Sequence, residues 1–227
     1  YNDVIYANGG DDTVNAWDGN DTIYGGTGND TIDAGNGDDI LVGGIGNDTL
    51  NGSYGNDTYV WNLGDGFDTI SDYQSSSTES REDKIKFGEG ISFENLSFEN
   101  SGNDLIIYVN GDKTQGLRLK DYFSGSNYAI EILEFADGST VNLTQIGLTF
   151  QQHDGSETIT GTDYNDVIYA NGGDDTLYGE NGNDILSGGT GHDRLNGGAG
   201  DDTYIWNLND GIDTINDSEG TNRIKLG

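Results

Sequence analysis

The sequence predicts an all-β protein in which two arrays of short repeats are separated by a small β-rich segment. Three observations support this prediction. The stretch YNDVIYANGGDDT at Tyr1–Thr13 recurs unchanged at Tyr164–Thr176. DTYVWNLGDGFDTI from Asp57 is closely matched by DTYIWNLNDGIDTI from Asp202. The two copies of this second stretch are eighteen residues closer together along the chain than the two copies of the first. Between the arrays lie short apolar or alternating stretches that are typical of strands.

The difference of eighteen is explained by a unit of nine residues. From Ala7 the chain divides into ANGGDDTVN, AWDGNDTIY, GGTGNDTID, AGNGDDILV, GGIGNDTLN and GSYGNDTYV. From Gly161 it divides into GTDYNDVIY, ANGGDDTLY, GENGNDILS, GGTGHDRLN and GGAGDDTYI. A further unit, QHDGSETIT, precedes the second array and has Glu157 where the others have Asp. Between the two shared stretches, the first array is therefore longer than the second by two units.

Each position of the unit has a physical reason. The fourth is mostly Gly, as a turn with positive φ or a close backbone approach requires. The sixth is Asp and the eighth is apolar, for example Val14, Ile23 and Leu41. We therefore expect about six residues of loop and a three-residue strand with one inward side chain. One such strand cannot bury that side chain, whereas stacked copies form a continuous core.

This pattern resembles G-G-x-G-x-D-x-U-x, the nonapeptide of the RTX, or haemolysin-type calcium-binding, family. The resemblance covers both arrays. It implies two right-handed parallel β-rolls with two nonads in each turn, and calcium between loops two nonads apart. It also implies secretion in an unfolded state by type I secretion machinery.

The resemblance assigns the metal ligands residue by residue. Sixth-position carboxylates two nonads apart would form pairs, and backbone carbonyls of the Gly-rich loops would complete six to eight oxygen ligands. The resulting set is Asp3, Asp12, Asp21, Asp30, Asp39, Asp48, Asp57, Glu157, Asp166, Asp175, Asp184, Asp193 and Asp202, with Gly10, Gly19, Gly28, Gly37, Gly46, Gly173, Gly182 and Gly191. Filling every pair would take about nine calcium ions.

The composition also favours a hard cation. With 41 acidic and 9 basic residues the formal net charge is −32. Such a chain repels phosphate backbones and anionic lipid, which argues against nucleic acid and membrane insertion. All-oxygen ligands select hard cations, and flexible carbonyl-rich loops suit calcium better than magnesium. The alternatives are a disordered acidic linker and Asp residues that merely solvate turns. The fixed spacing argues against both, because stacked like charges would repel each other without a cation.

Several positions depart from the pattern. Tyr164 replaces a fourth-position Gly, so weaker binding is expected in the loop at 163–166. After each array the sixth position becomes Gly66 or Gly211, where the metal ladder is expected to stop. The aromatic residues at these ends, Tyr59, Trp61, Tyr204 and Trp206, are predicted to be core residues that seal the last turn.

The segment between the arrays differs in character. Gln74–Asp83 is expected to form a surface loop, and Asn110-Gly111-Asp112 is a strong hairpin signal. The run from Asp83 to Ile146 is similar to the small β-rich domain that accompanies haemolysin-type repeats, and Asn222–Gly227 repeats its start. We predict a first roll at 1–72, a connecting or capping domain at 73–150, a second roll at 151–221 and the start of a further connecting domain at 222–227. The chain is thus expected to be a slice of a longer protein.

No catalytic motif is present in the sequence. Neither G-x-S-x-G nor H-E-x-x-H occurs, and no cysteine is available as a nucleophile or a thiolate ligand. Glu131 and Glu134 would lie on opposite faces of a strand, which favours solvated charges over an acid–base pair. We therefore expect a non-enzymatic, secreted or cell-surface module that folds on binding calcium and serves a larger protein as a structural, spacer or folding-assisting region. The alternative is a calcium-dependent adhesin-type module for glycans or surfaces, because tyrosines recur at the ninth position (Tyr6, Tyr24, Tyr169 and Tyr178).

Overall fold

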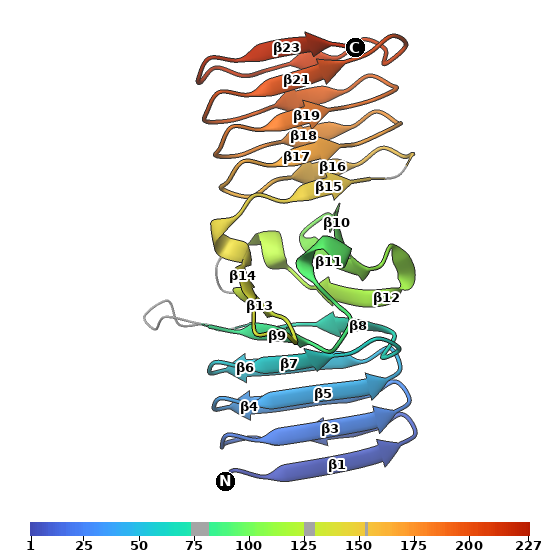
Figure 1. Cartoon of the computed structure of the whole chain (residues 1–227), viewed down its shortest axis with the longest axis vertical. Helices are drawn as coiled ribbons and strands as arrows, with labels where there is room; N and C mark the ends of the chain where they lie inside the picture. The colour runs from blue at the N-terminus through green and yellow to red at the C-terminus, as the bar shows by residue number, and fades with distance from the viewer. Residues whose placement is uncertain (74–81, 125–129, 153) are drawn as a thin grey trace. The chain divides into compact units, whose positions relative to one another are not determined.

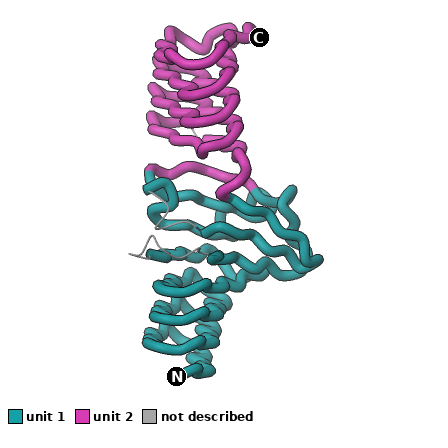
Figure 2. The backbone as a smooth tube through the Cα atoms, turned by 90° about the vertical axis from the view of Figure 1, so that its left-hand side faces the viewer, with its two compact units in different colours: residues 1–96, 103–143 teal, residues 97–102, 144–227 magenta. Residues whose placement is uncertain are grey.

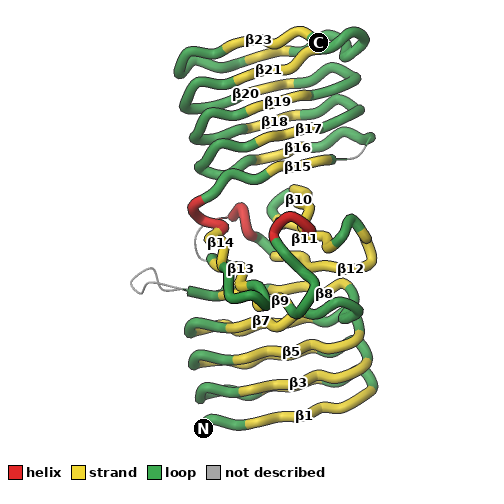
Figure 3. The backbone as a smooth tube through the Cα atoms, in the orientation of Figure 1, coloured by secondary structure: helices red, strands yellow, loops and turns green. Residues whose placement is uncertain are grey.

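The computed structural model describes residues 1–73, 82–124, 130–152 and 154–227 (Figure 1). Within these ranges every extended element is a β-strand, and the helices are single 3-10 turns at Phe93–Asn95 (η1), Tyr122–Ser124 (η2) and Leu143–Gln145 (η4) (Figure 3). No helix of the described ranges is long and apolar enough to cross a membrane. The chain forms two compact units, residues 1–96 with 103–143 and residues 97–102 with 144–227 (Figure 2). The predicted surface loop at Gln74–Asp83 falls almost wholly outside the described residues, and the four predicted segments stay a prediction.

The first unit begins with a β-roll whose nonads alternate between two parallel sheets. One sheet contains β1 (Val4–Gly9), β3 (Thr22–Thr27), β5 (Ile40–Ile45), β7 (Thr58–Trp61) and β9 (Lys84–Phe87). The other contains β2 (Thr13–Asn15), β4 (Thr31–Asn36), β6 (Thr49–Tyr54) and β8 (Phe67–Ile70). Neighbouring strands pair two nonads apart, as in Ile23↔Leu41 and Ile32↔Leu50. The predicted turn of two nonads is confirmed.

The core of the roll is a column of eighth-position side chains. Ile23, Ile32, Leu41, Leu50 and Tyr59 are all at most 1% exposed. The seventh and ninth positions flank them and point away, as the two-residue period of a strand requires. Each turn therefore contributes two inward side chains, and a continuous core exists only because the turns stack.

Strands of the first roll are longer than the predicted three residues. β3, β4, β5 and β6 have six residues each, because pairing resumes at the second and third positions of the next nonad, as in Gly26↔Gly44 and Thr27↔Ile45. In the second unit the corresponding contact is an isolated bridge, as in Gly172↔Thr190, and the strands have three residues as predicted.

The roll continues beyond the end of the nine-residue grid. β8 pairs with β6 through Thr49↔Thr69, two residues further along than the grid requires. β9 pairs with β7 through Thr58↔Lys84, which is eight residues further along. The extra residues lie between the paired strands in the sequence, and the parallel stacking is kept. The chain thus adds two strands to the roll that contain no complete nonapeptide.

The connecting segment extends both sheets of the first unit. β13 (Ile132–Glu134) pairs in parallel with β9 and antiparallel with β14 (Thr140–Asn142). β12 (Asp112–Leu119) pairs in parallel with β8 and antiparallel with β11 (Asp104–Val109). Asn110 and Gly111 have φ of 56° and 70° between β11 and β12, which is the two-residue hairpin turn expected from the sequence.

The second unit is also a parallel roll. One sheet contains β10 (Leu96–Ser101), β15 (Thr149–Gln151), β17 (Val167–Tyr169), β19 (Ile185–Ser187), β21 (Thr203–Trp206) and β23 (Arg223–Leu226). The other contains β16 (Thr158–Thr160), β18 (Thr176–Tyr178), β20 (Arg194–Asn196) and β22 (Thr214–Ile215). Strands again pair two nonads apart, as in Leu177↔Leu195, and the offset grows by two residues at the last pairs. The predicted fold class, parallel β-rolls of nonapeptide repeats with a small β-rich segment between them, is confirmed.

Candidate metal centre

The sixth-position carboxylates form a ladder along each roll. The backbone N–H of each sixth-position residue donates to Oδ1 of the sixth-position Asp one turn later, at 2.7 Å for Asp21 to Asp39 and 2.8 Å for Asp30 to Asp48. All nine predicted pairs are brought together in this way: Asp3/Asp21, Asp12/Asp30, Asp21/Asp39, Asp30/Asp48, Asp39/Asp57, Glu157/Asp175, Asp166/Asp184, Asp175/Asp193 and Asp184/Asp202. Their coordination of calcium stays a prediction.

The second carboxylate oxygen of most of these residues is buried without a hydrogen-bond partner. This holds for Oδ2 of Asp12, Asp21, Asp30, Asp39, Asp48, Asp57, Asp175, Asp184, Asp193 and Asp202, and for Oε2 of Glu157. An unpaired carboxylate oxygen in the interior costs several kcal/mol unless a cation or a proton compensates it. The described ion pairs join Lys84 and Lys86 to Glu134 and Arg118 to Asp104, so they do not supply that charge.

Asp166 is an instructive exception, next to the departure at Tyr164. Its Oδ2 accepts hydrogen bonds from the backbone N–H of Thr162 at 2.6 Å and from the Thr162 hydroxyl at 3.0 Å. A protein donor thus satisfies the oxygen that is left without a partner elsewhere. This contact supports the expectation of weaker metal binding in the loop at 163–166.

A carboxylate oxygen and a carbonyl oxygen lie close together beside the first-position glycine. A Cβ added to Gly25 would lie 2.4 Å from Asp30 Oδ2 and 2.6 Å from the carbonyl oxygen of Gly43. The same construction at Gly179 gives 2.3 Å to Asp184 Oδ2 and 2.5 Å to the carbonyl oxygen of Gly197. A carboxylate and a carbonyl oxygen thus converge there, which fits a hard cation. The predicted ligand set missed the first position, although the leading Gly of the nonapeptide is its signal.

Burial raises the pKa of several ladder carboxylates. The pKa of Asp39 and of Asp48 rises to about 6, chiefly because burial disfavours the charged form. The same cause raises the pKa of Asp184 to about 7 and that of Asp57 to about 8. Backbone N–H donors lower these values and neighbouring carboxylates raise them further. Without a cation, protonation of these four carboxylates is therefore easier than that of an exposed Asp.

A second ladder runs through the fifth position in the opposite direction. Its side-chain oxygen accepts from the backbone N–H of the fifth-position residue one turn later, at 2.8 Å from Asn29 to Asp11 and 2.9 Å from Asn47 to Asn29. The sequence reasoning missed this role. Its signal is the Asn or Asp that precedes the sixth-position Asp in most units. The two ladders together bind each turn to both of its neighbours.

The predicted fourth-position glycines allow the turns to stack. Gly28 has φ of +117°, and a Cβ there would lie 2.4 Å from the carbonyl oxygen of Gly10. Gly10 has φ of +109° but no atom within 4 Å of its own added Cβ, because it lies in the first turn. A substitution at Gly10 therefore meets only the strain of the positive φ, whereas one at Gly28 meets that strain and a clash with the neighbouring turn.

We expect Gly10→Ala to lower the free energy of unfolding by about 1–2 kcal/mol, the cost of a left-handed conformation. Gly28→Ala should cost at least about 2 kcal/mol more, because its Cβ also forces adjacent turns apart. Urea unfolding of both variants in saturating calcium measures the difference. Equal losses would show that the close approach of the turns contributes nothing.

The hydrogen-bonded ladder continues past Gly66 and Gly211, where the metal ladder is expected to stop. Asp68 accepts from the backbone N–H of Asp48 at 2.8 Å, and Asp83 accepts from that of Asp57 at 2.7 Å. Asp213 and Asn222 take the same places in the second roll. The longer loops shift the register without breaking it, so another residue enters the sixth-position place. The missed signal is local, because Asp68-Thr69-Ile70 and Asp213-Thr214-Ile215 repeat the D-T-U part of the nonapeptide.

The end-of-roll aromatic residues are core residues with one exception. Tyr59, Trp61 and Tyr204 are each 1% exposed, as predicted. Trp61 packs edge-on against Phe87, with ring centroids 6.2 Å apart. Trp206 is 38% exposed, so the prediction is wrong there, because its strand partner Leu226 is itself 71% exposed and provides no cover.

Comparison with known families agrees with the geometry. The RTX calcium-binding nonapeptide repeat matches four times, at residues 1–32, 33–70, 153–186 and 178–205, which together exceed half of the chain. The haemolysin-type calcium binding protein related domain matches residues 104–145, within the segment where the sequence suggested it.

Two individual proteins show the extent of the similarity. The iron-regulated protein FrpA of Neisseria meningitidis serogroup C is 34% identical over 115 residues, which is 49% of this chain and 9% of FrpA. The extracellular lipase LipA from Serratia marcescens is 21% identical, with a TM-score of 0.37, over 87% of this chain and 31% of the lipase chain. The chain thus corresponds to only a small part of either protein.

The stacked nonads and their buried carboxylate ladder define a calcium-binding β-roll. The chain belongs to the RTX calcium-binding nonapeptide repeat family. It carries a haemolysin-type related domain between its two rolls.

Proposed function

We propose that this chain is a non-enzymatic module that folds when it binds calcium outside the cell, and that it serves a larger secreted protein as a spacer or folding-assisting region. The observation that carries the proposal is the row of buried carboxylate oxygens without hydrogen-bond partners. These oxygens accept from no protein donor, so a cation would compensate them. Calcium carries the required charge and prefers carboxylate and carbonyl oxygens as ligands.

The ligands proposed for calcium are the sixth-position acids. Oδ1 of those beyond the first turn of each roll is held by a backbone N–H of the preceding turn, which fixes its orientation. Except at Asp166, their other oxygen is left to face the ion. The first-position carbonyls, as at Gly43 and Gly197, lie where they can complete the site. The nine pairs support a capacity of about nine ions.

Calcium bound at this many sites is sufficient to control folding. One site adds RT ln(1 + [L]/Kd), about 1.4 kcal/mol at tenfold excess of ligand. Nine such sites contribute about 13 kcal/mol, which is comparable with the whole stability of a typical domain, about 5–15 kcal/mol. Extracellular sites commonly bind calcium with Kd near 10⁻⁴–10⁻³ M, so the chain would remain unfolded at the low calcium of a cytosol.

Secretion by a type I machinery is proposed from the family and from composition. The chain contains no cysteine, so it needs no disulfide to fold. A chain with net charge −32 and no bound calcium stays expanded and therefore fits passage through a narrow export channel.

The number of bound ions tests the proposal directly. We expect native mass spectrometry of the full chain, dialysed against about 1 mM calcium, to show about nine calcium ions. Magnesium at the same concentration should add far fewer, because it keeps its waters and demands a tight octahedron. A chain that binds one or two calcium ions would contradict the ladder as the metal site.

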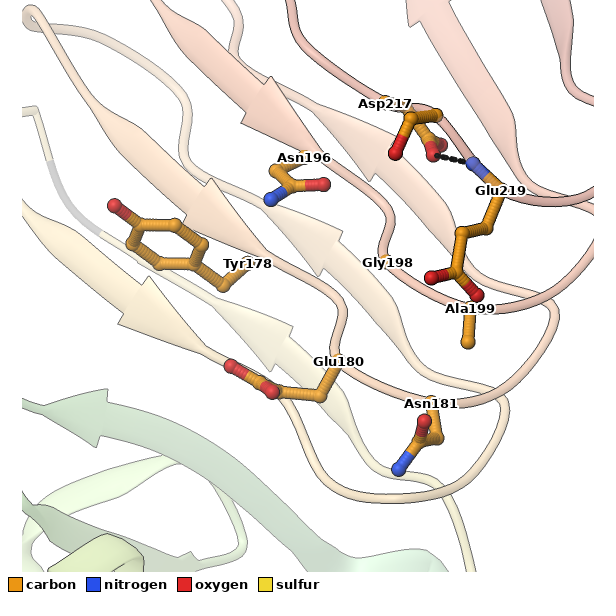
Figure 4. Close-up of a pocket in the computed structure, with 9 residues that line it drawn as sticks. Tyr178, Glu180, Asn181, Asn196, Gly198, Ala199, Asp217 and Glu219 are labelled. Atoms are coloured by element: carbon orange, nitrogen blue, oxygen red, sulfur yellow. Dashed lines mark hydrogen bonds between the residues drawn. The ribbon is translucent and has the colours of Figure 1, made fainter.

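A second candidate function is binding of a glycan, and one observation favours it. A polar pocket of about 300 Å³ on the second roll is lined by Tyr178, Glu180, Asn181, Asn196, Asp217 and neighbouring residues (Figure 4). An aromatic ring beside carboxylate and amide groups offers a sugar both a stacking face and hydrogen bonds. A glycan array with the calcium-loaded chain distinguishes the two functions: an inert spacer gives no signal, and a glycan site gives one that Tyr178→Ala abolishes.

A further inference from the structure

We propose that the end of the first roll holds a calcium site of a different kind, made by Asp57, Asp72 and Asp83. It rests on the proposed function, since it extends calcium binding beyond the pairs of nonapeptide residues. Asp57 belongs to the last nonad of the first array, whereas Asp72 and Asp83 lie outside every complete nonad.

The three carboxylates converge in the interior. Each offers an oxygen within 4.8 Å of the oxygens of the other two, and all three residues are at most 1% exposed. Two oxygens bound to one calcium ion at about 2.3–2.6 Å can be at most about 5 Å apart. The spacing therefore allows one ion to bind all three residues. In the described part of the chain, no other group of three or more His, Cys, Asp or Glu side chains brings its ligand atoms within 4.8 Å of one another.

Asp57 supplies an observation that is independent of the clustering. It is 0% exposed, its Oδ1 accepts from the backbone N–H of Asp39 at 2.8 Å, and its Oδ2 has no hydrogen-bond partner. A Cβ added to Gly52 would lie 2.2 Å from this Oδ2 and 2.6 Å from the Tyr59 hydroxyl oxygen. The unpartnered oxygen thus lies on the side of the site where that hydroxyl is found.

Tyr59 positions Asp72 for this site. Tyr59 replaces the aliphatic residue of the eighth position, and its hydroxyl accepts from the backbone N–H of Gly52 at 2.8 Å. The same hydroxyl donates to Asp72 Oδ2 at 3.0 Å. Asp83 is oriented by the backbone N–H of Asp57, which donates to its Oδ1 at 2.7 Å. Both added carboxylates are therefore held from the last turn of the roll, where β7 lies beside β9 (Figure 1).

The second roll ends with a natural variant of the same arrangement. Gly197 N–H donates to the Tyr204 hydroxyl at 2.7 Å, and that hydroxyl donates to Asp217. Asp202 N–H donates to Asn222 Oδ1 at 2.8 Å, so a neutral amide takes the place of Asp83. This end offers two carboxylates where the first roll offers three, and we expect it to bind calcium more weakly, because affinity follows the number of charged ligands.

Native mass spectrometry and calcium titration of the full chain test the proposal with three variants. At a free calcium concentration that just saturates the wild type, Asp72→Asn should bind one calcium ion fewer. Tyr59→Phe keeps the three carboxylates and loses only the hydrogen bond that positions Asp72, so it should keep the ion but bind it more weakly. Asn222→Asp should tighten one site by about tenfold, because it recreates the three-carboxylate set at the second end.

The outcomes separate this proposal from the proposed function. If the wild type binds no calcium, both fail. If the wild type binds calcium and Asp72→Asn binds the same number of ions, only the terminal site is overturned. Loss of the ion in Tyr59→Phe to the same extent as in Asp72→Asn would assign Asp72 a purely structural role and overturn the proposal. If Asp72→Asn does not fold, Asn222→Asp decides, and an unchanged calcium isotherm overturns it.

Discussion

Removal of calcium with excess EDTA near pH 7.5 is expected to unfold the chain. The ladder places carboxylates about 4.8 Å apart on successive turns, the spacing of neighbouring strands. Without a cation, their repulsion and their burial both oppose the stacked state. We expect the β-sheet signal in far-UV circular dichroism to be largely lost, and the radius of gyration from scattering to reach about 50 Å, as for an unfolded chain of this length.

Titration with calcium should then restore the β-sheet signal in a cooperative transition between about 0.1 and 1 mM. Magnesium at about 10 mM serves as the control and should leave the chain expanded, which excludes a general effect of ionic strength. A chain that gives the same spectrum in EDTA as in calcium would sink the proposal that calcium controls folding. The carboxylate ladder would then need another source of compensation, for which protonation is the remaining candidate.

The second large effect we expect concerns stability: it should change with pH in opposite directions with and without calcium. In the unfolded chain an Asp has a pKa of about 3.9. In the folded, metal-free roll, burial raises the pKa of Asp39 and Asp48 to about 6, that of Asp184 to about 7 and that of Asp57 to about 8. Between pH 4 and 8 the folded state therefore binds more protons than the unfolded state, so the stability of the metal-free fold decreases as the pH rises.

With calcium the sign is reversed, because the ion binds the deprotonated carboxylates and protons compete with it. Thermal unfolding at pH 5 and pH 8 measures both effects. In EDTA we expect more folded structure at pH 5 than at pH 8, and in about 10 mM calcium a higher Tm at pH 8. Each change corresponds to a difference in the free energy of unfolding on the order of several kcal/mol, summed over the ladder. A roll that becomes more stable with rising pH in EDTA would contradict the raised pKa values.

Much of the fold could be predicted from sequence because the repeat is periodic. The nine-residue spacing identified the turn of two nonads, and the apolar eighth position identified core residues such as Leu41 and Leu50, which are fully buried. The end of the roll could not be predicted in the same way. Asp68 and Asp83 enter the ladder after insertions of two and eight residues, and a fixed grid does not reveal a register that survives an insertion.

The candidate site was only partly predictable, for a physical reason. A sixth-position Asp is conspicuous because its side chain differs from its neighbours. The contributions of the first-position glycines and of the fifth-position side chains depend on which backbone atoms stack above them. Likewise the sequence predicts Tyr59 as a core aromatic residue. Its hydrogen bond to Asp72 cannot be predicted in the same way, because it forms only when β7 and the segment after β8 are folded together.

The two-nonad offset also determines how far along the chain each contact reaches. Relative to the whole length of the chain, this pairing distance corresponds to a relative contact order of about 0.08 within the rolls. This value is in the range of small helical proteins, although the structure is made of β-strands, and β-proteins usually fold slowly because their contacts are distant. A nascent turn needs only the turn before it as a template. We therefore expect each roll to grow by one coil at a time, at a speed that does not depend on how many repeats follow.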